Sequence, residues 1–128
     1  MPRARQLTIP CENCPGTLAN IAEILGKAKV NILAFNASSA GAIAYVQLVV
    51  DNANKAKKAL KRKGIPCYEE LVLHVKLSNT PGALGRFVRK LASKDINIGA
   101  GYQTTVPGSD KASVVLAVSH LESAARVR

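Results

Sequence analysis

Aromatic residues are scarce in this chain, with no Trp, three Tyr and two Phe among 128 residues. Proteins that bind single-stranded nucleic acid use aromatic side chains as stacking platforms, and this sequence supplies few of them. Acidic side chains are also few, because eight Asp and Glu stand against 18 Lys and Arg, for a formal net charge of +10. The charge points to an anionic partner, whereas the aromatic shortage disfavours nucleic acid as that partner.

Long apolar runs are absent as well, since none approaches the roughly 20 residues that a membrane-spanning helix needs. The first residues contain no apolar signal core. Three cysteines form no complete disulfide framework, and the single C-x-x-C at Cys11 and Cys14 has no second pair to complete a metal site. We therefore expect a cytoplasmic protein with reduced thiols, no membrane partner and no metal.

Catalytic patterns are missing too. The two histidines, His74 and His120, stand alone, and neither a Ser-His-Asp pattern nor a phosphate-binding loop occurs. We expect no enzyme, no catalytic residues and no cofactor.

What the sequence does contain is an internal repeat. The segment Asn13 to Leu18 reads NCPGTL, and residues 79 to 84 read NTPGAL. A Val-Asn-Ile around Asn31 follows the first segment, and an Ile-Asn-Ile around Asn97 follows the second. Pro81 lies 66 positions after Pro15, as Asn97 does after Asn31. A fixed spacing at both ends predicts two copies of one structural unit.

Each copy reads strand, helix, strand, strand, helix. This order predicts an α+β fold of two ferredoxin-like units, whose antiparallel sheets carry both helices on one face. We expect one domain over residues 1–69 and a second, truncated domain over 70–128 without a fourth strand. In sequence order, the expected strands are 4–11, 31–38, 42–50, 71–77, 98–105 and 112–119, with a candidate fourth strand of the first unit at 66–70.

Pro and polar residues mark the expected helix starts. Pro15 and Pro81 are expected as the first residues of helices that continue to about residues 28 and 94. Asp51 or Asn52 caps a helix to about residue 63, whose lysine-rich outer side is most simply a solvated face. Ser119 and Glu122 are spaced as a capping box for the last helix.

The doubled pattern of Asn-x-Pro-Gly-x-Leu, amphipathic helix and Val/Ile-Asn-Ile resembles the ACT domain, a regulatory module that binds amino acids. The likeness covers nearly the whole chain and is greatest to the ACT domains of phosphoglycerate dehydrogenase. It implies an amino-acid ligand held between the first loop of one domain and the second strand of another. Where that relative has a His before the loop Asn, this chain has Cys11 and Leu77, so the ligand preference of the relative does not transfer.

The resemblance places the ligand-binding residues in both copies. In the loops they are Asn13, Pro15, Gly16, Asn79, Pro81 and Gly82, and at the strand starts they are Asn31 and Asn97. The chemistry suits an amino acid, because a helix N-terminus attracts its carboxylate and an Asn amide both donates and accepts hydrogen bonds. The alternative is that the loop asparagines only form Asx turns before each helix.

The prediction that follows is a tandem ACT protein that binds an amino acid and acts as a sensor or regulatory subunit. We expect a homodimer or larger assembly, with a regulated enzyme as a further partner. The alternative function is an ACT-like scaffold without a ligand, whose basic surface binds nucleic acid or an acidic protein.

Overall fold

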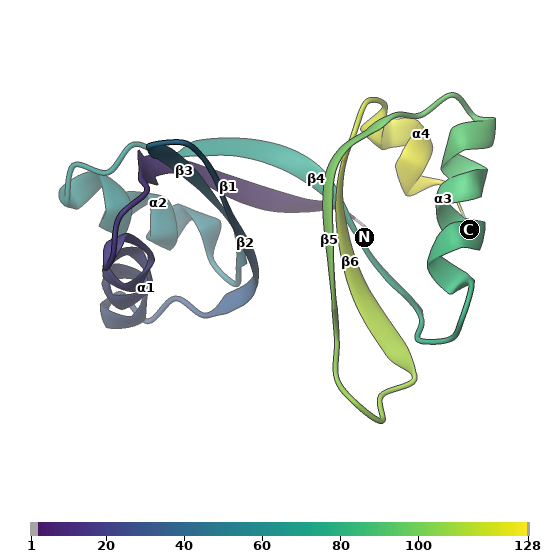
Figure 1. Cartoon of the computed structure of the whole chain (residues 1–128), viewed down its shortest axis with the longest axis horizontal. Coiled ribbons are helices and arrows are strands. Elements are labelled where there is room, and N and C mark those ends of the chain that lie inside the picture. The colour runs from purple at the N-terminus through teal and green to yellow at the C-terminus, as the bar shows by residue number, and fades with distance from the viewer. Residues whose placement is uncertain (1–2, 128) are drawn as a thin grey trace. The chain divides into compact units, whose positions relative to one another are not determined.

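The computed structural model describes residues 3–127, which form six strands and four helices (Figure 1). In chain order these are β1 (Arg3–Glu12), α1 (Thr17–Lys27), β2 (Ile32–Ala40), β3 (Ile43–Val50), α2 (Ala53–Arg62), β4 (Tyr68–Ser78), α3 (Ala83–Ser93), β5 (Ile98–Thr105), β6 (Lys111–Val118) and α4 (Leu121–Ala125). The fold is α+β, which confirms the predicted class. No helix in this described part of the chain is long and apolar enough to cross a membrane.

The chain divides into two compact units, which we describe separately. The N-terminal unit comprises residues 5–70, and the C-terminal unit comprises the start of the chain together with Leu71 onward. The prediction of two domains, 1–69 and 70–128, remains a prediction about independent folding.

In the N-terminal unit the strand order is β2-β3-β1, with the first residues of β4 on the far side of β1. β3 runs antiparallel to both neighbours, and its buried Val46 and Leu48 lie opposite Ile9 and Leu7 of β1. Because side chains alternate along a strand, these residues share one face of the sheet. α1 and α2 cover that face, and Ile21 and Leu25 of α1 are among its core contacts (Figure 1).

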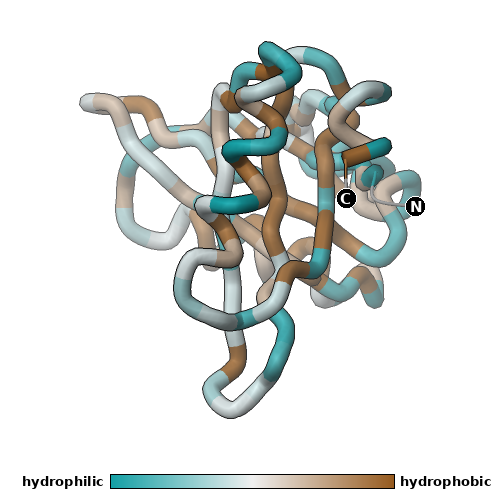
Figure 2. Tube along the Cα trace, turned by 90° about the vertical axis from the view of Figure 1, so that its right-hand side faces the viewer, coloured by the Kyte–Doolittle hydropathy of each residue, from teal (hydrophilic) through white to brown (hydrophobic). Residues whose placement is uncertain are grey.

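The C-terminal unit repeats this arrangement with β5-β6-β4. Its core joins Leu73, Val114 and Leu116 of the sheet to Phe87 and Leu91 of α3. α4 is short and adds Ala124 to the same core. Hydrophobic stretches of the chain alternate with hydrophilic ones, as the brown and teal colours show (Figure 2).

A single strand occupies the junction where the sequence indicated two segments. β4 runs without a break from Tyr68 to Ser78, so the candidate strand at 66–70 and the expected strand at 71–77 are one element. Its start belongs to the N-terminal unit, where Glu69 accepts hydrogen bonds from Arg5 of β1 and Lys57 of α2 at 2.7 to 3.1 Å. Conversely, Arg3 at the start of β1 is grouped with the C-terminal unit and pairs there with Glu122 of α4.

Helix starts differ from the prediction. α1 begins at Thr17 and α3 at Ala83, because the preceding Gly16 and Gly82 have φ of +91° and +84° and lie outside the helical region. Pro15 is thus part of a turn before the helix. The cap of α2 is as predicted, since the Asn52 side chain accepts a hydrogen bond from the Lys55 N–H at 3.1 Å.

The predicted capping box of the last helix is wrong. α4 begins at Leu121, after His120 in the capping position, and no side chain caps it. The Ser119 hydroxyl instead accepts a hydrogen bond from the backbone N–H of Asn97 at 2.9 Å. The Ser119 side chain therefore holds the start of β5 and does not cap the helix.

Candidate ligand site

The loops before α1 and α3 are tied to the neighbouring hairpins in the same way. Asn13 donates its side-chain amide to the Gly41 carbonyl at 3.0 Å, and its backbone N–H bonds to Ala42 at 2.9 Å. Asn79 repeats both contacts, with the Ser109 carbonyl at 3.0 Å and Asp110 at 2.9 Å. Each loop asparagine thus holds the β-turn of its own unit, a contact that differs from the local Asx turn of the alternative prediction.

The glycines that follow set the direction of each helix. In both units the Pro-Gly pair forms a turn, and the carbonyl of the glycine accepts the first helical hydrogen bond, from Asn20 to Gly16 at 2.9 Å and from Arg86 to Gly82 at 3.0 Å. All six predicted loop residues are exposed. The start of each helix is therefore open to solvent, where unpaired N–H groups attract an anionic group such as a carboxylate.

The strand-entrance asparagines are anchored through their backbones. The N–H of Asn31 donates to the Asp51 carboxylate at 3.0 Å, and the N–H of Asn97 donates to Ser119. Both residues are exposed. These contacts fix the strand start while using only the main chain of each asparagine.

A cavity of about 200 Å³ adjoins the first loop. Its polar lining includes Asn13, Cys14 and Thr17, together with Ser38 and Ser39 at the end of β2. Of the predicted residues in this unit, Asn13 lines the cavity, whereas Pro15, Gly16 and Asn31 do not. The two serines were missed by sequence reasoning, because only the register of β2 against β3 brings them beside the loop.

A second cavity, of similar size but different chemistry, lies beside the start of α3 and is not lined by the predicted residues Asn79, Pro81, Gly82 and Asn97. It measures about 190 Å³ and is bordered by Leu77, Ser78 and Phe87 with the cations Arg86 and Lys90. Arg86 extends toward the loop, since a Cβ added at Gly82 would lie 2.7 Å from its guanidinium. The first cavity is lined by Glu12 and by no Lys or Arg, so the two cavities differ in charge.

The cysteines lie partly beside the first cavity. Cys11 and Cys14 line it, and the Cys11 thiol donates to the Ala44 carbonyl at 3.6 Å. Burial raises the pKa of the Cys11 thiol, and Cys14 raises it further. Burial also raises the pKa of Cys67, so both of these thiols stay protonated at neutral pH. Among residues 3–127, no three potential ligands gather in a metal-binding arrangement.

His74 lies on β4 of the C-terminal unit, 2.7 Å from the Ser113 hydroxyl of β6. Burial lowers the pKa of His74, and Lys76 lowers it further. A neutral imidazole with a hydroxyl partner is typical of a histidine that joins two strands.

A family model described as the ACT domain pair matches residues 3–127. The chain belongs to the ACT family. None of the proteins with curated functions matches it. A solved protein from Bacteroides thetaiotaomicron is similar to this ACT chain, with a TM-score of 0.90 and 27% identity over 96% of this chain and 84% of that one.

The regulatory subunit of aspartate kinase from Thermus thermophilus is similar to the ACT chain, with a TM-score of 0.69 and 21% identity over 97% of this chain and 88% of that one. The corresponding subunit from Thermus flavus is similar with a TM-score of 0.65 and 20% identity, over 91% of this chain and 83% of that one. At these identities the likeness shows a shared fold. It confirms the tandem ACT architecture that the repeat predicted.

Proposed function

We propose that this ACT pair is a non-catalytic regulatory or sensor subunit whose effector is an amino acid. The observation that carries the proposal is the loop that the chain builds twice. Asn13 and Asn79 make equivalent hairpin contacts, and Gly16 and Gly82 share a left-handed backbone. A preformed loop at an exposed helix start, with a small cavity nearby, supports a role in binding.

The chemistry of the loop suits the charged ends of an amino acid. A helix N-terminus binds a carboxylate, while the exposed amides of Asn31 and Asn97 can both donate and accept hydrogen bonds. Each cavity is smaller than the roughly 300 to 1,000 Å³ typical of drug-sized ligands, which favours a small effector. Binding would act through a population shift, because the ligand stabilises the conformation for which it has the higher affinity.

A regulated enzyme is the partner that this role requires. Structural neighbours with the same fold are named as regulatory subunits of aspartate kinase, and one is described as aspartokinase alpha and beta subunits. These names support a regulatory function for the fold. We propose that the present chain likewise acts on a separate catalytic protein.

We also propose that the chain forms a homodimer through the edge of β2. This strand has β3 as its only neighbour among the described strands, and its Leu33 and Phe35 are 51% and 55% exposed. Unpaired edges with apolar side chains are usually covered in native proteins. A second copy of β2 would pair the exposed backbone and bury both side chains.

Thermal shift with each of the twenty amino acids tests the effector. A ligand at about 100 times its dissociation constant stabilises the folded state by about 2.7 kcal/mol, which raises Tm by several degrees. We expect one amino acid, or a chemically related group, to produce this rise. A flat response to all twenty would contradict the proposal.

Calorimetric titration with the active amino acid then tests the site. Asn31→Ala and Asn97→Ala should each weaken binding by about ten- to 150-fold, the effect of losing a hydrogen bond to a charged group. Asn20→Ala, an exposed change on α1 whose side chain does not line the cavity beside Asn13, is the matched control and should bind normally. Unchanged affinity in both variants would show that these asparagines serve only to close the strands.

A further inference from the structure

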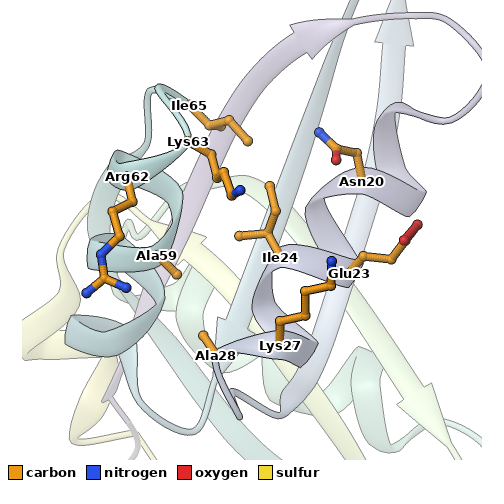
Figure 3. A pocket seen from close by; sticks show the side chains of 9 residues that line it. All are labelled: Asn20, Glu23, Ile24, Lys27, Ala28, Ala59, Arg62, Lys63 and Ile65. Carbon is orange, nitrogen blue, oxygen red and sulfur yellow. The ribbon is translucent and has the colours of Figure 1, made fainter.

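A cavity larger than the two described above lies away from the loops. It is a groove of about 410 Å³ between α1 and α2 of the N-terminal unit, on the outer side of the helix layer (Figure 3). It shares no residue with the cavity beside Asn13. The groove is therefore separate from the proposed effector site, and we consider a different function for it.

The floor of the groove is apolar. It is lined by Ile24 of α1 and Ala28 just after that helix, together with Ala59 of α2 and Ile65 after the following turn. Ile24, Ala28 and Ile65 are only half-buried, although they pack against the core of the unit. Their remaining exposed surface offers a place for one apolar side chain of a partner.

The rim is cationic. Lys27 at the end of α1 and Arg62 and Lys63 at the end of α2 border the groove, and all three are exposed. Lys63 extends toward Ile24 (Figure 3). Glu23 of α1 is the one acidic residue among those that line the groove, and its carboxylate points away from Lys63. The ion pairs described in residues 3–127 involve Arg3, Arg5 and Lys57, so none of them neutralises this rim.

Helix stability alone does not account for this charge. A cation at a helix C-terminus is favourable through the helix dipole, but α2 carries five cations and no acidic residue. The second copy folds without such a cluster, since the single charged residue of α4 is Glu122, paired with Arg3. The fold therefore does not require the basic groove.

We propose that the groove between α1 and α2 docks an acidic polypeptide segment with an apolar anchor residue, belonging to the protein that this subunit regulates. The inference deepens the proposed function and rests on it for the identity of the partner. Carboxylates of the segment would pair with Lys27, Arg62 and Lys63, while the anchor would enter the floor beside Ile24. Complementary charge would also speed the encounter of the two proteins.

Two other occupants fit less well. A nucleic acid could use the cations, but no aromatic side chain lines the groove for base stacking and a phosphate backbone leaves the apolar floor uncovered. A second copy of the chain has only eight Asp and Glu against 18 Lys and Arg, so it offers few carboxylates to pair with the cations of this groove.

Fluorescence anisotropy with short labelled peptides tests the proposal. The peptides carry one Leu, Ile or Phe flanked by Asp and Glu. In one matched set the acidic residues are replaced by Asn and Gln, and in another the apolar residue is replaced by Gly. We expect the acidic peptides with an apolar residue to bind most tightly, and each replacement to weaken binding. Lack of saturable binding by every acidic peptide would overturn the proposal.

Charge reversal locates the binding. In Lys27→Glu/Arg62→Glu/Lys63→Glu we expect the affinity for the best peptide to fall about tenfold, as expected for three exposed ion pairs. Lys55→Glu/Lys58→Glu/Lys61→Glu makes the same charge change on α2 outside the groove, and should have a much smaller effect. Equal losses in the two triple variants would indicate a general charge effect and overturn the groove assignment.

Competition by oligothymidine distinguishes the remaining class of partner. If oligothymidine displaces the peptide and binds more tightly, the groove is a nucleic-acid surface and the proposal is wrong. Thermal shift of the groove variant with the active amino acid separates this proposal from the effector site. If the groove variant loses peptide binding but still melts at a higher temperature with the amino acid, the groove and the effector site are separate. If the wild type shows no response to any amino acid but binds the peptide at the groove, the amino-acid effector is refuted and the groove proposal stands.

Discussion

Gly16 directs the chain from the loop into α1 with a left-handed backbone, at a φ of +91°. A side chain in this region costs about 1 kcal/mol or more, even though no atom lies within 4 Å of the position that a Cβ would take. We therefore predict that Gly16→Ala lowers the free energy of unfolding by about 1 kcal/mol. Urea denaturation measures the change.

Gly26 is the matched control, because it lies inside α1 and a Cβ there also has nothing within 4 Å. Alanine is favoured over glycine in a helix, so Gly26→Ala should raise the free energy of unfolding by about 0.5 to 1 kcal/mol. A loss of stability in both variants would mean that the backbone direction at Gly16 is not the cause.

At this scale, the sequence predicted which residues form the loops but not all of their contacts. Asn13 and Asn79 were identified from their repeated setting, and both lie at equivalent places. Their hairpin partners are 28 and 30 positions away along the chain. Such contacts depend on the register of distant strands, which local spacing does not reveal.

The start of β4 is held in the N-terminal unit by the carboxylate of Glu69. Hydrogen bonds from Arg5, and then from Lys57, lower the pKa of Glu69 from 4.5 to about 2. A lowered pKa means that its stabilising effect is complete above about pH 4.5 and is lost as the pH falls toward about 2. We predict that Tm of the wild type falls through this range partly because Glu69 becomes protonated.

Glu69→Gln should have a lower Tm at neutral pH and a smaller further decrease between pH 4.5 and about 2. Calorimetric melting across this range measures both effects. Glu23→Gln makes the same charge change at an exposed site on α1, and its decrease should match that of the wild type. A decrease in Glu69→Gln as large as in the wild type would contradict the assignment.

Element types could be predicted from periodicity, whereas two kinds of boundary could not. The strand β4 joins a segment after Pro66 to the repeat strand at Leu71. Its 11 residues are shared by two units, and no residue pattern near Leu71 indicates that the two segments form one strand. The helix starts were placed at Pro15 and Pro81 because Pro suits a first helical turn. The glycine after each Pro shifts the start by two residues.

Across the whole molecule, the charge is distributed in a way that composition alone does not show. The sequence indicated a solvated lysine face on the helix after Asn52. The structure adds that Lys27 and Lys63 lie at one groove with an apolar floor. These residues come from two helices, so their meeting depends on how α1 packs beside α2.

The two outer strands of the described sheet order, β2 and β5, differ in what they expose. β2 presents Leu33 and Phe35 to solvent, whereas the exposed residues of β5 are Gly99, Gly101, Gln103, Thr104 and Thr105. Burying an exposed apolar side chain is favourable by about 25 cal/mol per Å² removed from water. Of these two edges β2 offers the larger gain, so the proposed dimer should use it.

Phe35→Asp should therefore weaken the dimer, because it places a charge where the second copy would bury an aromatic ring. Phe35 lies opposite Leu48, and Gln103 of β5 lies opposite Val114. Gln103→Asp is thus a matched change on the other edge and should leave the dimer intact. Sedimentation velocity at micromolar concentration measures the assembly, and thermal melting checks that both variants fold. A wild-type monomer at these concentrations, or a dimer that survives Phe35→Asp, would rule out assembly through this edge.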